Sequence, residues 1–468
     1  MVEQDLATPG GNGQVSGVGG AGRRATFTVG TLVYHRANLV TLFAWLLWGD
    51  FIFNLMQTVM PSLLPLILKR HHATDSQIAI IVNSLFMLMN MLLNPVISYR
   101  SDRTRTRWGR RRPYILLTTP LVVLFLALIP YAPNLLKIVE RIPGAAGLLA
   151  LSPISTVILM FGVLVVGFQL FNMFISSVYY YLIVDVVPAP LIGRFYGLFR
   201  FFGSLAGVFY SFFIFPLAKT HMAMIFLVTA LLYGVCIMLM AWRVKEGQYP
   251  PPEKEEHGNW YSGIKNYARE CFGCPYYWWV FLVYGCYTWA GAANVFGIFF
   301  FRDEIGLSLA QIGKIGAIGG LICMAAAYPV GVLIDRWGSH KTLFIGFTAV
   351  PICSLATALL AHGFWSAVLL GVPATLATYT VGAAILNWTV AVYPRARYGQ
   401  FGSAGAMSSS LVAAGLSPLA GWLIDYVHSY RLVVCLWPAA FSLLGLAAAL
   451  VVYQRWKALG APDHYQPP

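Results

Sequence analysis

Charged side chains are scarce in this chain. Only 10% of its 468 residues are Asp, Glu, Lys or Arg, whereas 58% are hydrophobic. A soluble core of this size needs far more polar surface, so the composition excludes a soluble globular protein and indicates a polytopic membrane protein. The apolar runs are too long for a membrane β-barrel, whose strands show alternating segments of about ten residues.

Residue clusters that carry chemistry are also missing. The seven cysteines are scattered, and the C-x-x-C pair of Cys271 and Cys274 has no second ligand pair at zinc-binding spacing. No pair of nucleophile and base can be picked out, and no His or carboxylate cluster has metal-ligand spacing. We therefore expect a protein that is not an enzyme and that holds neither a metal nor a cofactor.

Twelve stretches are long and apolar enough to cross a bilayer, which takes about 20 residues. They cover residues 39–68, 77–99, 113–132, 155–183, 195–218, 223–242, 276–301, 311–334, 341–361, 365–393, 402–427 and 432–454. The sequence therefore predicts an all-α integral membrane protein with twelve helices.

Basic residues concentrate on one side of these helices. If both termini are cytoplasmic, that side holds 22 of the 31 Lys and Arg, the outer side holds 8, and Arg200 lies within a span. This asymmetry follows the positive-inside rule and predicts a multi-pass protein of the cell membrane with both termini in the cytoplasm. It also explains the net charge of +14 without any nucleic-acid partner.

Five parts can be distinguished along the chain. A glycine-rich start without apolar runs predicts a disordered cytoplasmic tail, and a segment with Pro250-Pro251-Pro252 and mixed charges predicts a linker. The parts are a tail 1–36, a six-helix bundle 37–242, a cytoplasmic linker 243–275, a six-helix bundle 276–455 and a tail 456–468. One chain supplies both bundles, so we expect a monomer to suffice.

Two charged loops occupy equivalent positions in the two halves. The first runs from Ser101 to Tyr114, and the second has an Asp-Arg pair followed by a glycine. An Asp at a helix end beside basic residues can pair with the neighbouring bundle in one state and release it in another. We expect these residues to gate the cytoplasmic side: Asp102, Arg103, Gly109, Arg110, Arg111, Asp335, Arg336 and Gly338. The alternative is that the charges only set the topology.

The second loop resembles the major facilitator pattern G-x-x-x-D-R-x-G-x-x-K. This resemblance implies two six-helix bundles related by a pseudo-two-fold axis. It also implies alternating access around a site near the bilayer midplane.

The first loop points to a narrower resemblance. From Pro95 to Pro113 it is similar to P-x-x-x-Y-x-S-D-R-x-x-x-R-[FW]-G-R-R-R-P of the glycoside-pentoside-hexuronide:cation symporters and the related sucrose transporters. The element Gly49-Asp50-Phe51 and the run Arg200–Gly207 also resemble elements of that family, whereas the second half resembles only the wider superfamily. The resemblance implies a transporter of a sugar or glycoside.

The second span departs from this family's pattern. The sodium-coupled permeases carry D-x-x-x-D-P there, whereas this chain has Asn90 and Asn94 before Pro95. Two amides lose both formal charges of a hard-cation site, so proton coupling or uniport becomes the favoured interpretation and sodium coupling an alternative.

Asp50 is the one acid that lies deep inside a predicted span. Asn54 and Gln57 follow it at i+4 and i+7 on one helix face, and Arg200 is the only arginine embedded in a span. An intramembrane carboxyl is by default a functional candidate, and the resemblance implies a sugar and coupling acid here. We expect Asp50 to bind a proton or a substrate hydroxyl, with Arg200 tuning it or sharing the substrate. A static buried ion pair is the alternative.

Further amides and tryptophans would suit a sugar site, because ring faces stack on sugars and amides bond to hydroxyls. Besides Asn90 and Asn94, these are Gln169, Asn172, Trp289, Asn294, Asn387 and Trp388, while Asp185 is assigned to a cytoplasmic loop. Packing between helices is an equally valid role for each amide. The sequence thus predicts a proton-coupled sugar symporter; a carrier of drugs or other metabolites and a non-transporting membrane sensor are the alternatives.

Overall fold

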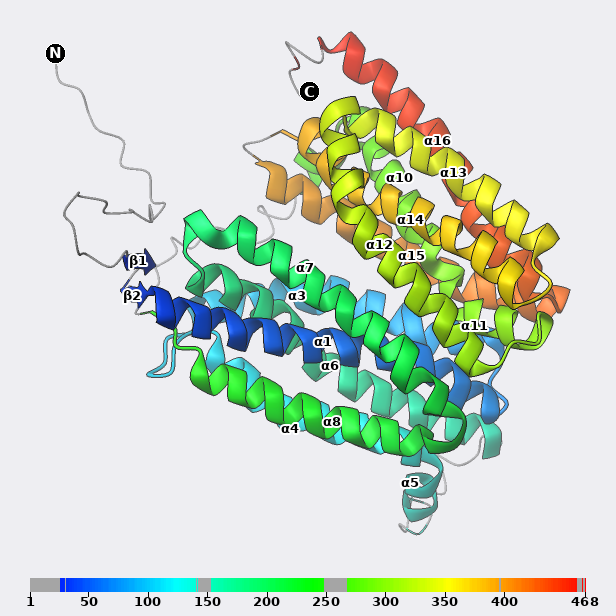
Figure 1. Ribbon diagram of the computed structural model, residues 1–468, viewed down its shortest axis with the longest axis horizontal. Helices are drawn as coiled ribbons and strands as arrows, with labels where there is room; N and C mark the ends of the chain where they lie inside the picture. The colour runs from blue at the N-terminus through cyan, green and yellow to red at the C-terminus, as the bar shows by residue number, and fades with distance from the viewer. Residues whose placement is uncertain are drawn as a thin grey trace.

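The computed structural model describes residues 26–29, 31–139, 141, 153–247, 267–394, 397–460, 465 and 468. A short hairpin of strands β1 (Thr26–Val29) and β2 (Leu32–His35) precedes the first helix, and every longer element is helical. Figure 1 shows long helices that run roughly side by side in two groups.

The first group runs from α1 to α8. It contains α1 (Arg36–Arg70), α2 (Asp75–Ala79), the π-helical turn η1 (Ile80–Ser84), α3 (Leu85–Arg103), α4 (Arg112–Leu128), η2 (Ile129–Tyr131), α5 (Ala132–Val139), α6 (Pro153–Val186), η4 (Ala189–Leu191), α7 (Ile192–Phe209), η5 (Tyr210–Ile214), η6 (Phe215–Leu217) and α8 (Ala218–Arg243).

The second group runs from α10 to α16. It contains α10 (Pro275–Ala290), η7 (Gly291–Phe296), α11 (Gly297–Phe299), η8 (Phe300–Glu304), α12 (Leu309–Trp337), α13 (Ser339–Leu360), α14 (Phe364–Val392), α15 (Tyr398–Val427) and α16 (Tyr430–Ala458).

The expected number of spans agrees with these elements. Within the described ranges, ten stretches are long and apolar enough to cross a membrane. One of them, residues 189–243, holds the antiparallel helices α7 and α8 (Figure 1). The broken helix 275–304, made of α10, η7, α11 and η8, matches the expected span 276–301. The all-α prediction is therefore confirmed, with about ten to twelve helices among the described residues that could cross a membrane.

Turn chemistry explains where several helices begin. The side chains of Thr74 and Gln77 form a capping box at the start of α2, and those of Ser308 and Gln311 form one at the start of α12. Gly338 separates α12 from α13 with a φ of +83°, a conformation that residues with a Cβ rarely adopt.

The two ends of the helices define two faces of the molecule. We call one face the terminal face: it holds the β1–β2 hairpin, the loop after α3 and the ends of α8 and α16. The opposite face, with the α1–α2 and α15–α16 turns, is the far face. The core of the first bundle continues into the second through residues near the far face, among them Phe296, Phe299 and Ile424. The second bundle keeps its own core around Trp388 and Phe347. The apolar seam between the bundles is therefore densest toward the far face.

Candidate functional site

A buried carboxyl lies midway along α1. Asp50 has no exposed surface, and Asn54 Nδ2 donates to its Oδ1 at 2.7 Å and to its backbone oxygen at 2.9 Å. Its Oδ2 has no hydrogen-bond partner among the described residues. Nearly all buried polar atoms have a partner, so an orphan carboxylate oxygen in a membrane protein makes Asp50 a candidate functional group.

Amides of α3 and α6 lie in the same bundle as this carboxyl, and one of them bonds to Gln57, two turns along α1 from Asp50. Asn172 on α6 donates to Gln57 Oε1 at 3.3 Å, and Asn94 Oδ1 accepts from the Ser177 hydroxyl at 2.8 Å. The structure therefore brings Asp50, Asn54, Gln57 and Asn172 into one region of the first bundle, whereas Asn94 is engaged in bonding α3 to α6. Sequence reasoning did not single out Ser177.

Gly203 on α7 explains how closely that helix approaches the cluster. A Cβ at Gly203 would lie 3.1 Å from Asn54 Nδ2, and Asn54 is itself fixed by its bonds to Asp50. Only a residue without a side chain leaves the amide in place. Gly203 belongs to the Arg200–Gly207 run, which the sequence singled out only by its resemblance to a family element and not as a contact of Asn54.

Arg200 faces the second bundle. It is exposed on α7, and its charge interacts with Asp50 and with the hydroxyls of Tyr180, Tyr287 and Tyr379. Since Tyr287 and Tyr379 belong to α10 and α14, Arg200 lies at the boundary between the bundles. No ion pair joins Arg200 to Asp50 in the described part of the chain, so the two residues interact through space without the direct bond of a static pair.

The remaining predicted site residues are distributed more widely. Gln169 is buried in α6. The indole Nε1 of Trp289 donates a hydrogen bond to the backbone oxygen of Ser409 at 2.9 Å. Asn90 is half-buried on α3. Asn387 and Trp388 lie near the terminal end of α14, away from Asp50, and Trp388 is completely buried against His340.

Asn294 lines a cavity between the bundles. The cavity has a volume of about 470 Å³ and lies beyond Asp50 toward the far face, where Ser62 and Asn83 of the first bundle meet η7, α12 and α14. Asn83 Nδ2 also donates to Ala292 O at 3.3 Å, which joins the two bundles beside the cavity. The cavity offers amide and hydroxyl groups to a polar solute from both bundles.

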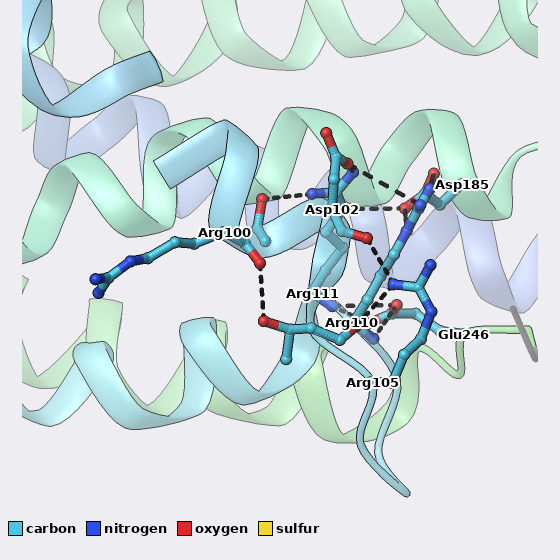
Figure 2. A network of polar contacts seen from close by, with 9 residues as sticks. Arg100, Asp102, Arg105, Arg110, Arg111, Asp185 and Glu246 are labelled. Carbon is cyan, nitrogen blue, oxygen red and sulfur yellow. Dashed lines mark hydrogen bonds and ion pairs between the residues drawn. The ribbon is translucent and has the colours of Figure 1, made fainter. Parts of the chain in front are cut away.

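The first charged loop forms a network on the terminal face (Figure 2). Arg110 donates to both carboxylate oxygens of Asp185, at 2.5 and 3.0 Å, and Arg111 donates to Asp185 at 3.1 Å. Arg111 also pairs with Asp102, and its guanidinium stacks over the Tyr181 ring at 4.9 Å. Asp185 lies at the end of α6, on the terminal face as the sequence indicated. All these partners belong to the first bundle, so the network holds α3, α4 and α6 together.

Glu246 is a functional candidate that sequence reasoning missed. Its carboxylate accepts from the backbone N–H groups of Arg110, Arg111 and Arg112 at 2.7 to 3.2 Å, and it thereby caps the start of α4 (Figure 2). A carboxylate at a helix N-terminus satisfies orphan N–H groups and complements the helix dipole. Gly109, with φ +107°, turns the chain so close that its Cβ position would overlap Glu246. Glu246 follows α8, so the linker starts fixed to the first bundle.

The second charged loop makes fewer contacts. Asp335, Arg336 and Gly338 are exposed, and no ion pair of Asp335 or Arg336 is formed with any residue that the structure describes. Arg103, in the first loop, is half-buried at the end of α3. The two loops are therefore equivalent in position but differ in their contacts.

The far face carries hydrogen bonds from one bundle to the other. Asp425, near the end of α15, accepts from the backbone N–H of Asp75 at 3.0 Å and from the N–H and hydroxyl of Ser76 at 3.1 and 2.9 Å. Asp75 in turn accepts from Lys69 Nζ at 2.9 Å and from the Tyr430 hydroxyl at 3.1 Å. We call these five residues the far-face latch.

The latch completes the N-terminal cap of α2, because residues of α2 and its own N-cap bond only part of the free N–H groups at this helix start. The capping box of Thr74 and Gln77 uses the N–H groups of those two residues, which leaves the N–H groups of Asp75 and Ser76 for Asp425. Among the described residues, the hydrogen bonds between the bundles involve the segment from Asp75 to Ser84, toward the far face. The bundles are thus hydrogen-bonded to one another toward the far face, and no such bond joins them at the terminal face within the described ranges.

Comparisons with known proteins agree with this architecture. The model of the Major Facilitator Superfamily matches residues 46–414 and, in a second match, residues 280–467. No curated protein sequence matches the chain.

Several solved structures share the fold. A bacterial homolog to the human lysosomal transporter Spinster, inward-facing and unoccupied, is 14% identical, has a TM-score of 0.66 and covers 93% of this chain and 100% of its own. The nucleoside transporter NupG is 12% identical, with a TM-score of 0.65 and coverage of 88% and 100%. A D-xylose-proton symporter is 14% identical, with a TM-score of 0.63 and coverage of 89% and 98%.

Proposed function

The chain belongs to the Major Facilitator Superfamily and is a membrane transporter, and we propose that it moves a sugar or glycoside in symport with protons. The proposal rests first on Asp50, a completely buried carboxyl with one bonded and one unpartnered oxygen. The resemblance of the first charged loop to glycoside symporters supplies the substrate class. The same fold serves a D-xylose-proton symporter, so it can house this chemistry.

Protonation of Asp50 provides the coupling step. A proton taken from the outer solution binds the free Oδ2, and the neutral acid can then donate a hydrogen bond to a substrate hydroxyl. Neutralisation also removes the cost of a buried charge, because desolvation disfavours the ionised form of a carboxyl. Loss of the proton to the cytoplasm restores the carboxylate, which accepts the hydrogen bond from the Asn54 amide.

Alternating access follows from the contacts on the two faces. The structure is closed by the far-face latch, and we place the terminal face in the cytoplasm because most Lys and Arg lie on that side. In this assignment the described state opens inward. The opposite state requires Asp425 to leave the start of α2 and the bundles to meet at the terminal face.

The amides around Asp50 favour a neutral, hydroxyl-rich solute. Asn54, Gln57 and Asn172 can exchange their mutual bonds for bonds to hydroxyls, and Arg200 adds a donor from the boundary between the bundles. A sodium site on α3 is disfavoured, because Asn90 and Asn94 carry no charge and the Asn94 oxygen already accepts from Ser177.

Uptake into proteoliposomes tests the proposal. Labelled mono- and disaccharides are offered under an inward proton gradient and, separately, an inward sodium gradient. We expect protons alone to drive accumulation, and the variant Asp50→Asn to lose accumulation while retaining downhill exchange of the sugar. Asp303→Asn is the matched control, because it makes the same change at an exposed residue that pairs with its neighbour Arg302.

The outcomes separate the parts of the proposal. Sodium-driven accumulation, or proton-driven accumulation that survives Asp50→Asn, would refute the coupling role of Asp50. Absence of uptake for every sugar, alongside uptake of nucleosides or organic cations, would refute the substrate class and leave only the transporter assignment.

A further inference from the structure

A basic groove lies at the terminal end of α4 and α8. It has a volume of about 710 Å³ and lies between the start of α4 and the segment that follows α8. Its lining consists of Trp108, Arg112, Leu116, Trp242, Arg243 and Lys245. Three of the six residues are cations and none is an acid.

The cations of the groove are held in different ways. The Arg112 guanidinium donates to Ala241 O at 2.6 Å and to Trp242 O at 2.9 Å, so it fixes the end of α8 against the start of α4. The Arg243 guanidinium stacks over the rings of Trp242 and Trp45 at 5.3 and 5.8 Å. Lys245 is exposed. Arg112 thus has a structural role, while Arg243 and Lys245 offer charge to a ligand.

Glu246, the acid nearest to the groove in the sequence, does not line the groove. Glu246 follows Lys245 directly, but both of its oxygens accept from backbone N–H groups at the start of α4. It is absent from the groove lining. An anion in the groove would therefore meet Arg243 and Lys245 directly, while the Glu246 carboxylate stays bonded to the start of α4.

The groove lies at the outer side of the first bundle, between the polar ends of two helices and their apolar surface. Helices α4 and α8 lie side by side on the side of the first bundle that faces away from the second (Figure 1). The indoles of Trp108 and Trp242 are 49% and 63% exposed, and tryptophans of this kind gather at the boundary between hydrocarbon and headgroups. Further along the same helices, Leu117 and Val235 are exposed, as expected for a surface that contacts acyl chains.

We propose that this groove binds the headgroup of an anionic phospholipid. The phosphate lies against Arg243 and Lys245, the indoles of Trp108 and Trp242 border the glycerol region, and the acyl chains follow the apolar surface that begins at Leu116. Basic pockets between membrane helices bind anionic headgroups in this way. The lipid phosphate would also neutralise Arg243 and Lys245, the cations of the segment that carries Glu246. It would thereby help to hold the beginning of the linker to the first bundle.

Lipid binding to the full-length, detergent-purified protein tests the proposal. Native mass spectrometry would compare dioctanoyl phosphatidylglycerol with dioctanoyl phosphatidylcholine, with inorganic phosphate as a third probe. Each cation near a headgroup contributes about 1 kcal/mol, or about fivefold in affinity, so the variant R243Q/K245Q should bind phosphatidylglycerol about 25-fold more weakly. Binding of phosphatidylcholine should be unchanged. The single variant Lys245→Gln, at an exposed position, should bind phosphatidylglycerol about fivefold more weakly. It serves as the test if the double variant fails to fold.

The variant R455Q/K457Q is the matched control. It removes two cations from the terminal end of α16, where Arg455 and Lys457 also stack on aromatic rings, at 6.0 and 4.6 Å. We expect it to keep the wild-type preference for phosphatidylglycerol. Equal losses in the two double variants would show a general charge effect and overturn the proposal. Unchanged binding in R243Q/K245Q, or full competition by inorganic phosphate at equal concentration, would also overturn it.

Discussion

Removal of the Asp425 carboxylate should open the far face. Asp425 accepts three hydrogen bonds at 2.9 to 3.1 Å from Asp75 and Ser76 of the other bundle, and its carboxylate is the cap of α2 that comes from outside the helix. Replacing an N-cap acid by Ala costs about 0.5–2 kcal/mol. In the far-open state Asp425 is solvated, so the whole loss falls on the closed state. A loss of about 1.4 kcal/mol shifts the ratio of closed to open about tenfold.

Two substitutions give a graded test of this reasoning. Asp425→Ala removes every acceptor and should shift the ratio about tenfold, while Asp425→Asn keeps one neutral acceptor and should shift it about threefold, half as much in free energy. Lys69, Asp75 and Tyr430 keep their mutual bonds in both variants. Asp303→Asn again serves as control, because its partner Arg302 is the adjacent residue of the same bundle.

Spin-label distances in lipid nanodiscs measure the shift. One pair of labels at His72 and Tyr426, both exposed, spans the two bundles at the far face. A second pair at Arg107 and Trp337 spans them at the terminal face. The far-face distance should gain a longer component in the order wild type, Asn, Ala, while the terminal-face distance gains a shorter one in equal proportion. Unchanged distances would refute the latch, and far-face widening without terminal-face closure would show local fraying instead of alternating access.

Two further substitutions test the support of the site. Gly203→Ala places a Cβ 3.1 Å from the Asn54 amide, so we expect the apparent KM for substrate to rise severalfold in the uptake assay while the protein keeps its thermal stability; an unchanged KM would show that the amide moves freely. Glu246→Gln halves the cap of α4 and should lower the free energy of unfolding by about 1 kcal/mol, which a lower midpoint of thermal unfolding would reveal. Glu270→Gln, at an exposed acid that pairs with Arg397, should leave that midpoint unchanged, and equal midpoints in the two variants would argue against the capping role.

The membrane-spanning helices could be predicted from the sequence because bilayer thickness sets a simple length rule for apolar runs. The rule does not reveal breaks within a span, because residues in π-helical and 3₁₀ turns can be as apolar as those in the α-helices around them. The last crossing before α12 is such a case: α10 gives way at Gly291 to η7, α11 and η8. These irregular turns lie beside the cavity between the bundles, where they shape the lining.

Asp50 and the charged loops could be found from the sequence because charge in or between apolar runs is conspicuous. The far-face latch could not, because Asp425 and Asp75 are 350 residues apart and each reads as an ordinary acid at a helix end. Glu246 was hidden for the same reason: its partners are backbone N–H groups, which leave no trace in residue identity. Sequence patterns report side-chain periodicity, whereas both of these contacts depend on how separate helices are placed.

The contacts of the two faces suggest which residues exchange partners during transport. On the terminal face, Arg110, Arg111 and Asp185 bond within the first bundle, so they can stay bonded while that bundle moves as a unit. The far-face latch joins the bundles, so the proposed alternating access requires it to break. Asp335 and Arg336, exposed and without an ion pair among the described residues, are then the charges free to form terminal-face bonds when the latch opens. We therefore expect the ratio of the two states to depend on the balance between the Asp425 cap and the bonds that the second loop acquires, and not on the stability of the first-loop network.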